Sequence, residues 1–376
     1  MISRDLRRAI ARAVAAAGFQ PARDPGLRPT GISGRYAASV ALTLGPDPRD
    51  TAGSLAGTLA QEPWIASVEV TGPGYLTITV TPGALAAVAD AVTSAGPACV
   101  TSDALAGQTV PAPPVGDPLA APTWEEARAA LAVRLTARLA VAAGAVVTDS
   151  PFPERVRVSP PVTTDPGTGV ARAVAFAGRD AVLFTLARAI PGRPLRVQQE
   201  IIARHVLGNP AYAVRYAHAR AASGLRWAVA SRGGDPPYPL LSSRAGPMAK
   251  TAIVSGPPVG TAVSGDTGVP PREAMVPPCP PADPGELALL DALSWLPERV
   301  ATAARRGRPD EFARYLEDLA SVTVDVLSSA SRPGTGGTGR GKEAAPGSDR
   351  LTLARAARTG LAAGLGLLEV SAPDRL

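Results

Sequence analysis

The 376-residue sequence has few of the side chains that build metal sites, disulfide frameworks and catalytic triads. Its two cysteines, Cys99 and Cys279, lie far apart and indicate neither a metal cluster nor a disulfide framework. Its two histidines, His205 and His218, lie near no cysteine and no pair of acids in the sequence. We therefore predict no metal, no cofactor and no catalytic residue. The low cysteine content indicates a reducing, cytoplasmic setting.

Lysine is also scarce, because Lys250 and Lys342 are the only two, so arginine supplies almost all of the positive charge. The formal net charge is +6 and the sequence pI is about 9.8, which favours an anionic partner. Since the sequence is rich in Ala, Pro and Gly, part of the arginine content reflects a GC-rich coding bias. No uncharged apolar run reaches the length of a membrane span, and the charged N-terminus is no signal peptide. We expect no membrane partner.

Acidic residues are missing from one long stretch, residues 201–234, which also holds both histidines. Its arginines and large aromatic residues are Arg204, Arg215, Arg220, Arg226, Arg232, Tyr212, Tyr216 and Trp227. On a helix capped by Asn209 and starting at Pro210, the residues Tyr212, Tyr216, Arg220, Ser223 and Trp227 form one stripe. An aromatic stripe is typical of a buried helix face. A basic helix without acids also suits phosphates and unpaired bases, so both interpretations stay open at this point.

Periodicity predicts an α+β protein with three parts. These are an N-terminal α/β module at 1–107, a short α/β segment at 123–190 and an all-α bundle at 191–376. The expected helices are 1–18, 51–61, 82–94, 124–143, 180–189, 286–305, 311–329 and 351–368. The expected strands are two around the turn at 72–74, one at 156–162 and one at 171–177. The Pro-rich segment 108–122 is interpreted as a linker, and 233–285 and 331–349 as flexible.

Several strings resemble one protein family. NPAYAVRYAHARAAS at 209–223 is similar to the start of the helical, DALR-type anticodon-binding domain of arginyl-tRNA synthetases, where the pattern is close to NPvyYvqYAHARi.S. LLDALSWLPERVATAARRGRPDEFARYLEDLAS at 289–321 and LARAARTGLAAGLGLLEVSAPDRL at 353–376 resemble later parts of that domain, in the family's order. GRYAASVALTLG at 34–45 and VTGPGYLTITV at 70–80 resemble the family's N-terminal additional domain. The resemblance spans roughly two thirds of the chain.

The resemblance implies a protein that binds tRNA, with arginine tRNA as the expected partner. It places contacts on the helix that begins at Pro210 and, through the N-terminal module, at the elbow of the tRNA. The candidate tRNA-binding residues are Tyr212, Arg215, Tyr216, Arg220, Arg226 and Trp227, and the elbow candidates are Arg35, Tyr36 and Tyr75. We expect Arg215, Tyr216 and Arg220 on or near the RNA-facing surface of this helix and His218 turned toward the bundle.

The two signature motifs of the family's catalytic domain, HIGH and KMSK, are absent. No histidine precedes His205 and no lysine precedes Lys250. We interpret 123–190 as a collapsed remnant of the catalytic domain, made of one or two β-α units, and expect a tRNA-binding protein without catalysis. Two alternatives stay open. In the first alternative the chain is a divergent, ATP-dependent arginine–tRNA ligase. In the second it is a protein-interaction module that serves a tRNA-using pathway.

The sequence departs from the family pattern near the expected anticodon pocket. Thr323, Val324, Val326 and Leu327 stand where relatives carry aromatic and histidine residues. Leu376 replaces a terminal Met, and Glu369 replaces a Gly. These changes remove stacking groups and add one negative charge. We expect them to weaken base-specific readout more than general tRNA affinity.

Overall fold

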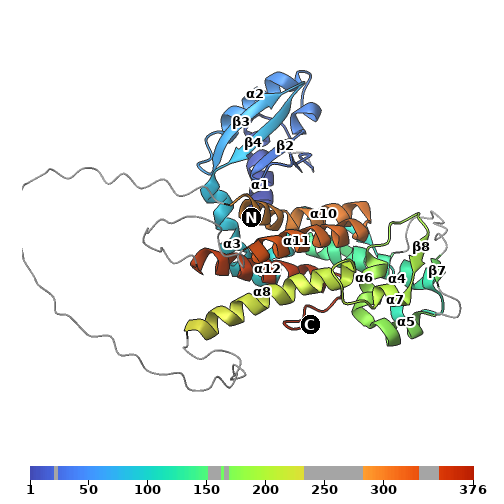
Figure 1. The fold of residues 1–376 in the computed structure, drawn as a ribbon. Coiled ribbons are helices and arrows are strands. Elements are labelled where there is room, and N and C mark those ends of the chain that lie inside the picture. Colours follow the sequence, from blue (N-terminus) through green and yellow to red (C-terminus); the bar gives the residue numbers. More distant parts are fainter. Residues whose placement is uncertain (21–23, 151–161, 165–168, 233–282, 330–346) are drawn as a thin grey trace, which may run out of the picture.

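The computed structural model describes residues 1–20, 24–150, 162–164, 169–232, 283–329 and 347–376. A small sheet stands above a layer of long helices, and a group of short helices and strands lies at one end of that layer (Figure 1). The protein is therefore of the mixed helix and sheet class that the sequence predicts.

The sheet belongs to the N-terminal module and is antiparallel, with strand order β1-β2-β4-β3. Its strands are β1 (Arg28–Pro29), β2 (Arg35–Ala38), β3 (Ile65–Thr71) and β4 (Tyr75–Val80). The predicted turn between the last two is confirmed. Gly72 and Gly74 adopt positive φ, and a Cβ on Gly74 would lie 2.6 Å from the carbonyl oxygen of Pro48. Only glycine fits this position without moving α2 (Pro48–Leu59), which packs on β3 and β4.

Helices α1 (Ile2–Ala16) and α3 (Pro82–Ala95) reach from the module to the helical layer. The short 3-10 helix η1 (Val40–Thr43) follows β2, and η2 (Gly96–Val100) follows α3. Among the described residues, the stretch Pro82–Val100 has the length and mean hydropathy, 1.3, of a membrane span, with Asp90 as its one charged residue. Its buried side chains face α9 and α12, so they form part of the protein core.

Two β-α-β units occupy the middle of the chain. In the first, β5 (Thr109–Pro111) pairs in parallel with β6 (Val146–Thr148), and η3 (Pro118–Ala120) and α4 (Trp124–Ala142) connect them. In the second, β7 (Val162–Thr164) pairs in parallel with β8 (Leu195–Val197) across α5 (Val170–Ala177) and α6 (Arg179–Ala187). The segment 108–122 thus contributes a paired strand and the buried Leu119, which a free linker would not.

Two predictions of secondary structure are wrong, one in the middle of the chain and one in the C-terminal half. Residues 171–177 were expected as a strand but lie within α5, where Val170 and Ala173 are buried one helical turn apart. The single helix expected at 286–305 is two helices that meet at Trp295, with Pro297 in the first turn of the second. The residues 156–161 of another expected strand lie outside the described residues.

The C-terminal half forms the helical layer. Its helices are α7 (Gln199–Ile202), α8 (Pro210–Arg232), α9 (Pro284–Ser294), α10 (Leu296–Arg306), α11 (Pro309–Ser329) and α12 (Gly347–Leu367). α8 lies along α11 and α12 (Figure 1). One continuous cluster of buried apolar residues runs from Ile2 in α1 to Val370 after α12. Most of the two segments expected to be flexible lies outside the described residues.

Candidate nucleic-acid interface

The start of α8 is fixed by Asn209, as the sequence predicts. The Asn209 side-chain oxygen accepts a hydrogen bond from the amide of Ala211 at 3.2 Å, and its amide group donates to the carbonyls of Ile202 and Arg204, each at 2.8 Å. Asn209 is 5% exposed, so one buried side chain joins the preceding loop to the helix. The loop and the first turn of α8 are therefore held in a defined arrangement.

The buried face of α8 differs from the aromatic stripe. Ala211, Val214, Ala217 and Ala221 face α11 and α12. His218 is buried on this side as well, and its ring Nδ1–H donates to the carbonyl of Pro373 at 3.0 Å. His218 therefore turns inward as expected.

The aromatic stripe forms a partly accessible row on the other side of α8. His205, Tyr212 and Tyr216 stack in sequence, with ring centroids 5.4 Å and 5.8 Å apart and planes within 13° and 23° of parallel. Further along, Trp227 is 49% exposed. Burial alone does not explain this stripe, because its rings keep contact with solvent. A row of parallel accessible rings is a surface on which unpaired bases stack.

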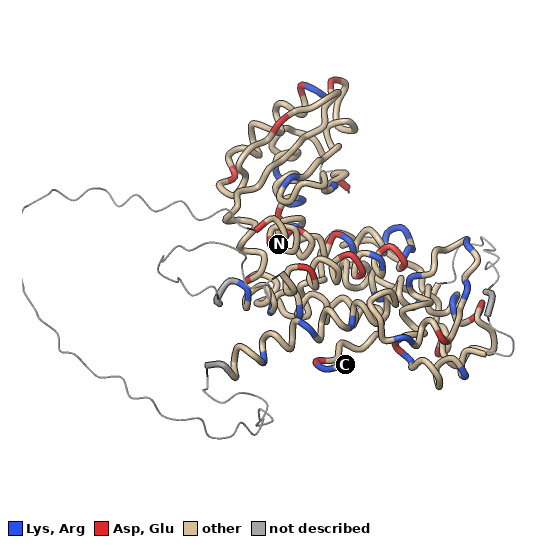
Figure 2. Tube along the Cα trace, viewed as in Figure 1, with Lys and Arg blue, Asp and Glu red and all other residues tan. Residues whose placement is uncertain are grey.

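The arginines of α8 have several roles. Figure 2 shows basic and no acidic residues along this helix. Arg215 forms an ion pair with Asp180 at 3.3 Å and donates to the Ser371 hydroxyl at 3.3 Å. Arg226 donates to the carbonyl of Asp374 at 2.9 Å. These two guanidinium groups therefore hold the C-terminal segment. The Arg215 side chain is 24% exposed, and its contact with RNA stays a prediction.

Glu369 is neutralised by three arginines. Its carboxylate pairs with Arg134 at 2.6 Å and with Arg138 and Arg179 at 3.9 Å each, and its side chain is 10% exposed. Arg138 also donates to the carbonyls of Gly366 and Leu367 at the end of α12. The additional negative charge expected near the anticodon pocket therefore serves to join α12 to α4 and α6. The expected weakening of base-specific readout stays a prediction, and the ion pairs of Glu369 reduce the part of it that rests on this added charge.

The three elbow candidates of the N-terminal module differ in position. Tyr75 is 43% exposed, and Arg35 is partly exposed and pairs with Glu69 at 3.1 Å. Tyr36 is fully buried, donates to Asp291 at 2.5 Å and packs against Trp295 at 5.6 Å. Burial raises the pKa of both Tyr36 and Asp291. Contrary to the expectation from the sequence, Tyr36 is a packing residue between module and bundle, because RNA has no access to its ring.

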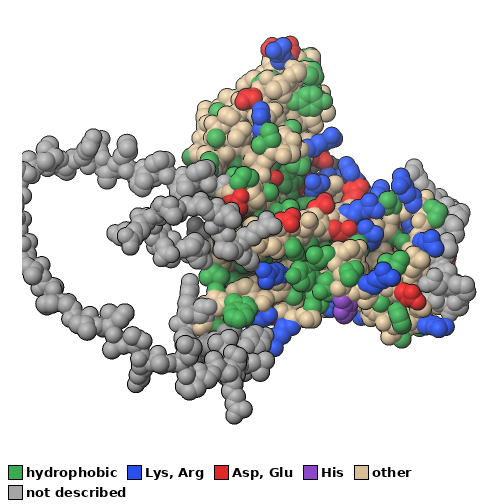
Figure 3. Space-filling model, viewed as in Figure 1, with side chains coloured by type: hydrophobic (Ala, Val, Ile, Leu, Met, Phe, Trp, Pro, Cys, Tyr) green, Lys and Arg blue, Asp and Glu red, His purple; other side chains and the backbone are tan. Residues whose placement is uncertain are grey.

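Sequence reasoning missed a group of basic residues beside α8. Arg188, Arg193, Arg196 and Arg314 line one pocket at the start of that helix. A signal for three of them is present in the sequence, because residues 181–199 contain no acid. Figure 3 shows several basic side chains, among apolar and a few acidic ones, on the right half of the visible face.

The fold combines an N-terminal α/β module with a C-terminal bundle of helices. The family model named DALR anticodon binding domain matches residues 270–376. An arginine–tRNA ligase of Micrococcus luteus is 42% identical over 98 residues, which is 25% of this chain and 18% of that protein. An arginine–tRNA ligase of Frankia alni is 31% identical over 200 residues, or 53% of this chain and 29% of that protein. The matches thus span less than a third of each relative.

A solved structure shares the overall arrangement. Thermus thermophilus arginyl-tRNA synthetase aligns with a TM-score of 0.54 at 14% identity, with all of both chains covered, which shows a common fold. Together the family model, the relatives and this structure make the chain an arginyl-tRNA synthetase-like protein with a DALR anticodon-binding domain.

Proposed function

We propose that this chain binds tRNA, with arginine tRNA as the partner, and that it does not by itself attach the amino acid. The observation that carries the proposal is the surface of α8. Tyr212, Tyr216 and the exposed Trp227 lie on a helix without acids, and His205 of the preceding loop stacks on Tyr212. This helix packs against α11 and α12, which belong to the residues matched by the DALR anticodon binding domain model. The cytoplasm, where tRNA and reduced cysteines occur together, is the proposed location.

The physical basis is stacking combined with charge neutralisation. Each base that stacks on an aromatic ring contributes about 1–3 kcal/mol, and each neutralised phosphate releases counterions and steepens the salt dependence. Arg220 lies on the same face of α8 as Tyr212 and Tyr216, which places a positive charge beside the rings.

The absence of catalysis is inferred from the sequence and the middle segment. No histidine precedes His205 and no lysine precedes Lys250, so the residues that stabilise charge in adenylate formation are lacking there. Within the described residues this region holds two parallel sheets of two strands each. This arrangement supports the interpretation of a reduced catalytic domain.

A second candidate is a divergent arginine–tRNA ligase, and the names of the similar proteins favour it. Arginine-dependent exchange between ATP and pyrophosphate separates the two. We expect no exchange above background with this chain alone. Robust exchange would replace our proposal with the ligase.

A protein partner at the same surface is a third candidate. The use of Arg215 and Arg226 to hold the C-terminal segment favours it, because these arginines are then less available for RNA. RNA that copurifies with the protein from cells, seen as an absorbance ratio and then sequenced, supports the tRNA proposal. Nucleic-acid-free protein would favour the protein partner.

The proposal is tested by removal of one ring from α8. Trp227→Ala should weaken tRNA binding by about 1–3 kcal/mol, because an accessible stacking surface is lost. Val229→Ala is the matched control, since Val229 lies on the same helix, is 74% exposed and offers no ring. Binding is measured by titration of labelled arginine tRNA, with circular dichroism as a check on folding. Equal affinities for the two variants would contradict the proposed surface.

A further inference from the structure

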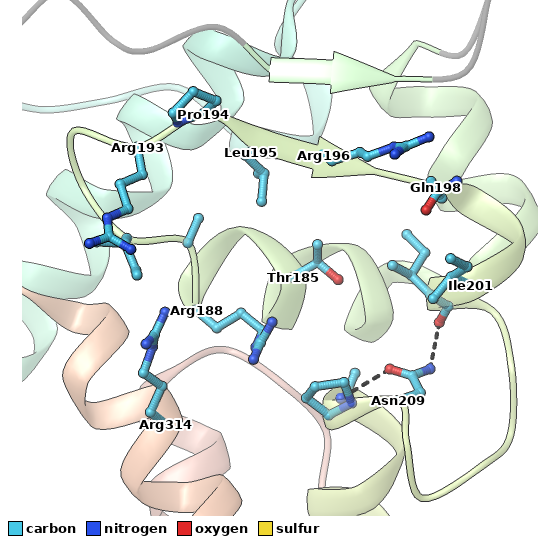
Figure 4. A pocket seen from close by; sticks show the side chains of 15 residues that line it. Thr185, Arg188, Arg193, Pro194, Leu195, Arg196, Gln198, Ile201, Asn209 and Arg314 are labelled. Carbon is cyan, nitrogen blue, oxygen red and sulfur yellow. Dashed lines mark hydrogen bonds between the residues drawn. The ribbon is translucent and has the colours of Figure 1, made fainter.

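A pocket of about 290 Å³ opens between α6, the segment 188–198, the first turn of α8 and α11. Four arginines line it: Arg188, Arg193, Arg196 and Arg314 (Figure 4). Figure 4 shows Arg188, Arg193 and Arg314 on one side of the pocket and Arg196 on the other. The volume lies just below the range of about 300–1,000 Å³ typical of sites for drug-sized ligands, so the pocket suits a small charged group.

The charge of the pocket is only partly compensated. Arg188 forms a two-point ion pair with Glu317, with nitrogen–oxygen distances of 2.8 Å and 3.2 Å. Arg193, Arg196 and Arg314 are exposed, and none of them forms an ion pair with an acid of the described residues. Three guanidinium groups therefore surround the cavity with unbalanced positive charge. Such an arrangement is stabilised by an anion.

The loop that carries Arg193 is held by a buried arginine. Arg128 of α4 is 7% exposed, and its guanidinium donates to the carbonyl oxygens of Arg193 at 2.9 Å and of Ile190 at 2.5 Å. Burial lowers the pKa of Arg128. The hydrogen bonds from the buried Arg128 hold the turn at 190–193 in place. They therefore fix the backbone position of Arg193 beside the cavity.

The first turn of α8 adds to the positive electrostatic potential of the pocket. Asn209, Pro210 and Ala211 line the pocket, and the first turn of this 23-residue helix contains no acid. The positive end of the helix dipole therefore lies at the cavity and adds to the attraction for an anion. Asn209 also connects the pocket to the neighbouring loop with His205, whose ring stacks on Tyr212.

We propose that this pocket binds a phosphate group, held by the forked guanidinium groups of Arg193 and Arg314 with Arg196 at the opposite wall. Planar guanidinium groups bind phosphate oxygens through two parallel hydrogen bonds, which matches the clustering of arginines and the scarcity of acids here. The backbone of RNA supplies such a group next to a base on the His205–Tyr212 rings. That the phosphate group belongs to RNA rests on the proposed function. The phosphate site itself does not, since a free phosphate presents the same chemistry.

The test uses the full chain with the double variant Arg193→Ala/Arg314→Ala. The matched control is Arg12→Ala/Arg49→Ala, which removes the same charge from exposed positions of the N-terminal module. Two probes are titrated into each protein. Inorganic phosphate is added at constant ionic strength and followed by the melting temperature, and arginine tRNA is followed at several salt concentrations. The Arg193→Lys/Arg314→Lys variant keeps the charge without the forked geometry and replaces the alanine variant if that does not fold.

We expect the pocket variant to bind tRNA about tenfold more weakly, with a salt slope smaller by about one to two units, and the control to bind like the wild type. Unchanged tRNA binding with a lost response to inorganic phosphate would support the pocket and assign it to free phosphate. A phosphate response that depends on the pocket in a protein that binds no tRNA would support the pocket and refute the proposed function. If neither probe distinguishes the pocket variant from the control, the inference is overturned.

Discussion

At the scale of single residues, Glu369 shows how a substitution acquires a new role. It lies two residues after the end of α12 with φ of 61°, a conformation that favours glycine, and the synthetase pattern that this segment resembles has glycine there. The strain of about 1–2 kcal/mol is offset by ion pairs with Arg134, Arg138 and Arg179. Glutamate at this position therefore strains the backbone, but its ion pairs join the end of α12 to α4 and α6.

This balance predicts that glycine is tolerated better than alanine at this position. Both Glu369→Ala and Glu369→Gly lose the ion pairs, but only glycine also relieves the positive φ. We expect the alanine variant to be less stable than the glycine variant by about 1 kcal/mol. Urea unfolding of the two variants measures this difference. An alanine variant as stable as the glycine variant would show that no backbone strain is present.

His218 predicts a pH dependence of stability. Burial lowers its pKa, and the carbonyl of Pro373 and the charge of Asp374 oppose this shift only in part. Below about pH 6.5 the unfolded chain binds a proton on this ring, whereas the folded chain binds it only at lower pH. The contribution of His218 to stability is therefore present above pH 6.5 and lost as the pH falls toward the folded pKa.

His218→Gln should remove this contribution, because glutamine keeps a donor for Pro373 and does not titrate. Thermal unfolding from about pH 7.5 down to pH 5 should then show a shallower loss of stability than in the wild type. Parallel curves for the two proteins would mean that His218 titrates alike in the folded and unfolded states.

At the scale of elements, local sequence signals predicted much of what the structure shows. Asn209 and Pro210 predicted the start of α8, and the Gly-Pro-Gly sequence predicted the β3–β4 turn. Residues 171–177 were misjudged because alanine alternates with Arg172, Val174 and Phe176, a pattern of period two that is typical of a strand. The helix forms because alanine favours it and Gly178 ends it.

The candidate site was predictable in its aromatic stripe but less so in its charges. The stripe follows from helical spacing within one segment. The partner of Arg215, Asp180, lies 35 positions earlier, and the partner of Tyr36, Asp291, belongs to another part of the fold. Such distant pairs depend on how elements pack, and local patterns do not contain that information. The pocket arginines come together for the same reason, since Arg314 joins the others only through packing of α11.

The contact between α12 and α11 predicts contrasting effects at two glycines of the same helix. A Cβ on Gly364 would lie 2.5 Å from Cδ2 and 3.4 Å from Cγ of the buried Leu316, whereas a Cβ on Gly366 would meet nothing within 4 Å. Gly366→Ala should raise stability by about 0.5–1 kcal/mol through helix propensity. Gly364→Ala should be less stable than Gly366→Ala by about 1–3 kcal/mol through overpacking. Denaturant unfolding of both variants provides the test, and equal stabilities would contradict the close approach of α11.

At the scale of the whole molecule, the N-terminal module and the bundle share one core. Arg7 of α1 makes a two-point ion pair with the buried Glu298 of α10, and the Ser3 hydroxyl donates to the carbonyl of Ser294 at 2.6 Å. With Tyr36 and Asp291, these contacts fix the sheet module relative to α8. Under the proposed function, the module and α8 would contact two parts of one folded RNA.

The central claim is that the chain binds tRNA, and a competition experiment tests it most directly. Labelled arginine tRNA is bound to the purified protein at low salt and displaced by unlabelled arginine tRNA, another tRNA or a random RNA duplex, and the titration is repeated at rising salt. We predict preference for tRNA over the duplex, strongest for arginine tRNA, and a logarithm of the binding constant that falls linearly with the logarithm of salt concentration. Equal displacement by the duplex and by arginine tRNA would contradict the account.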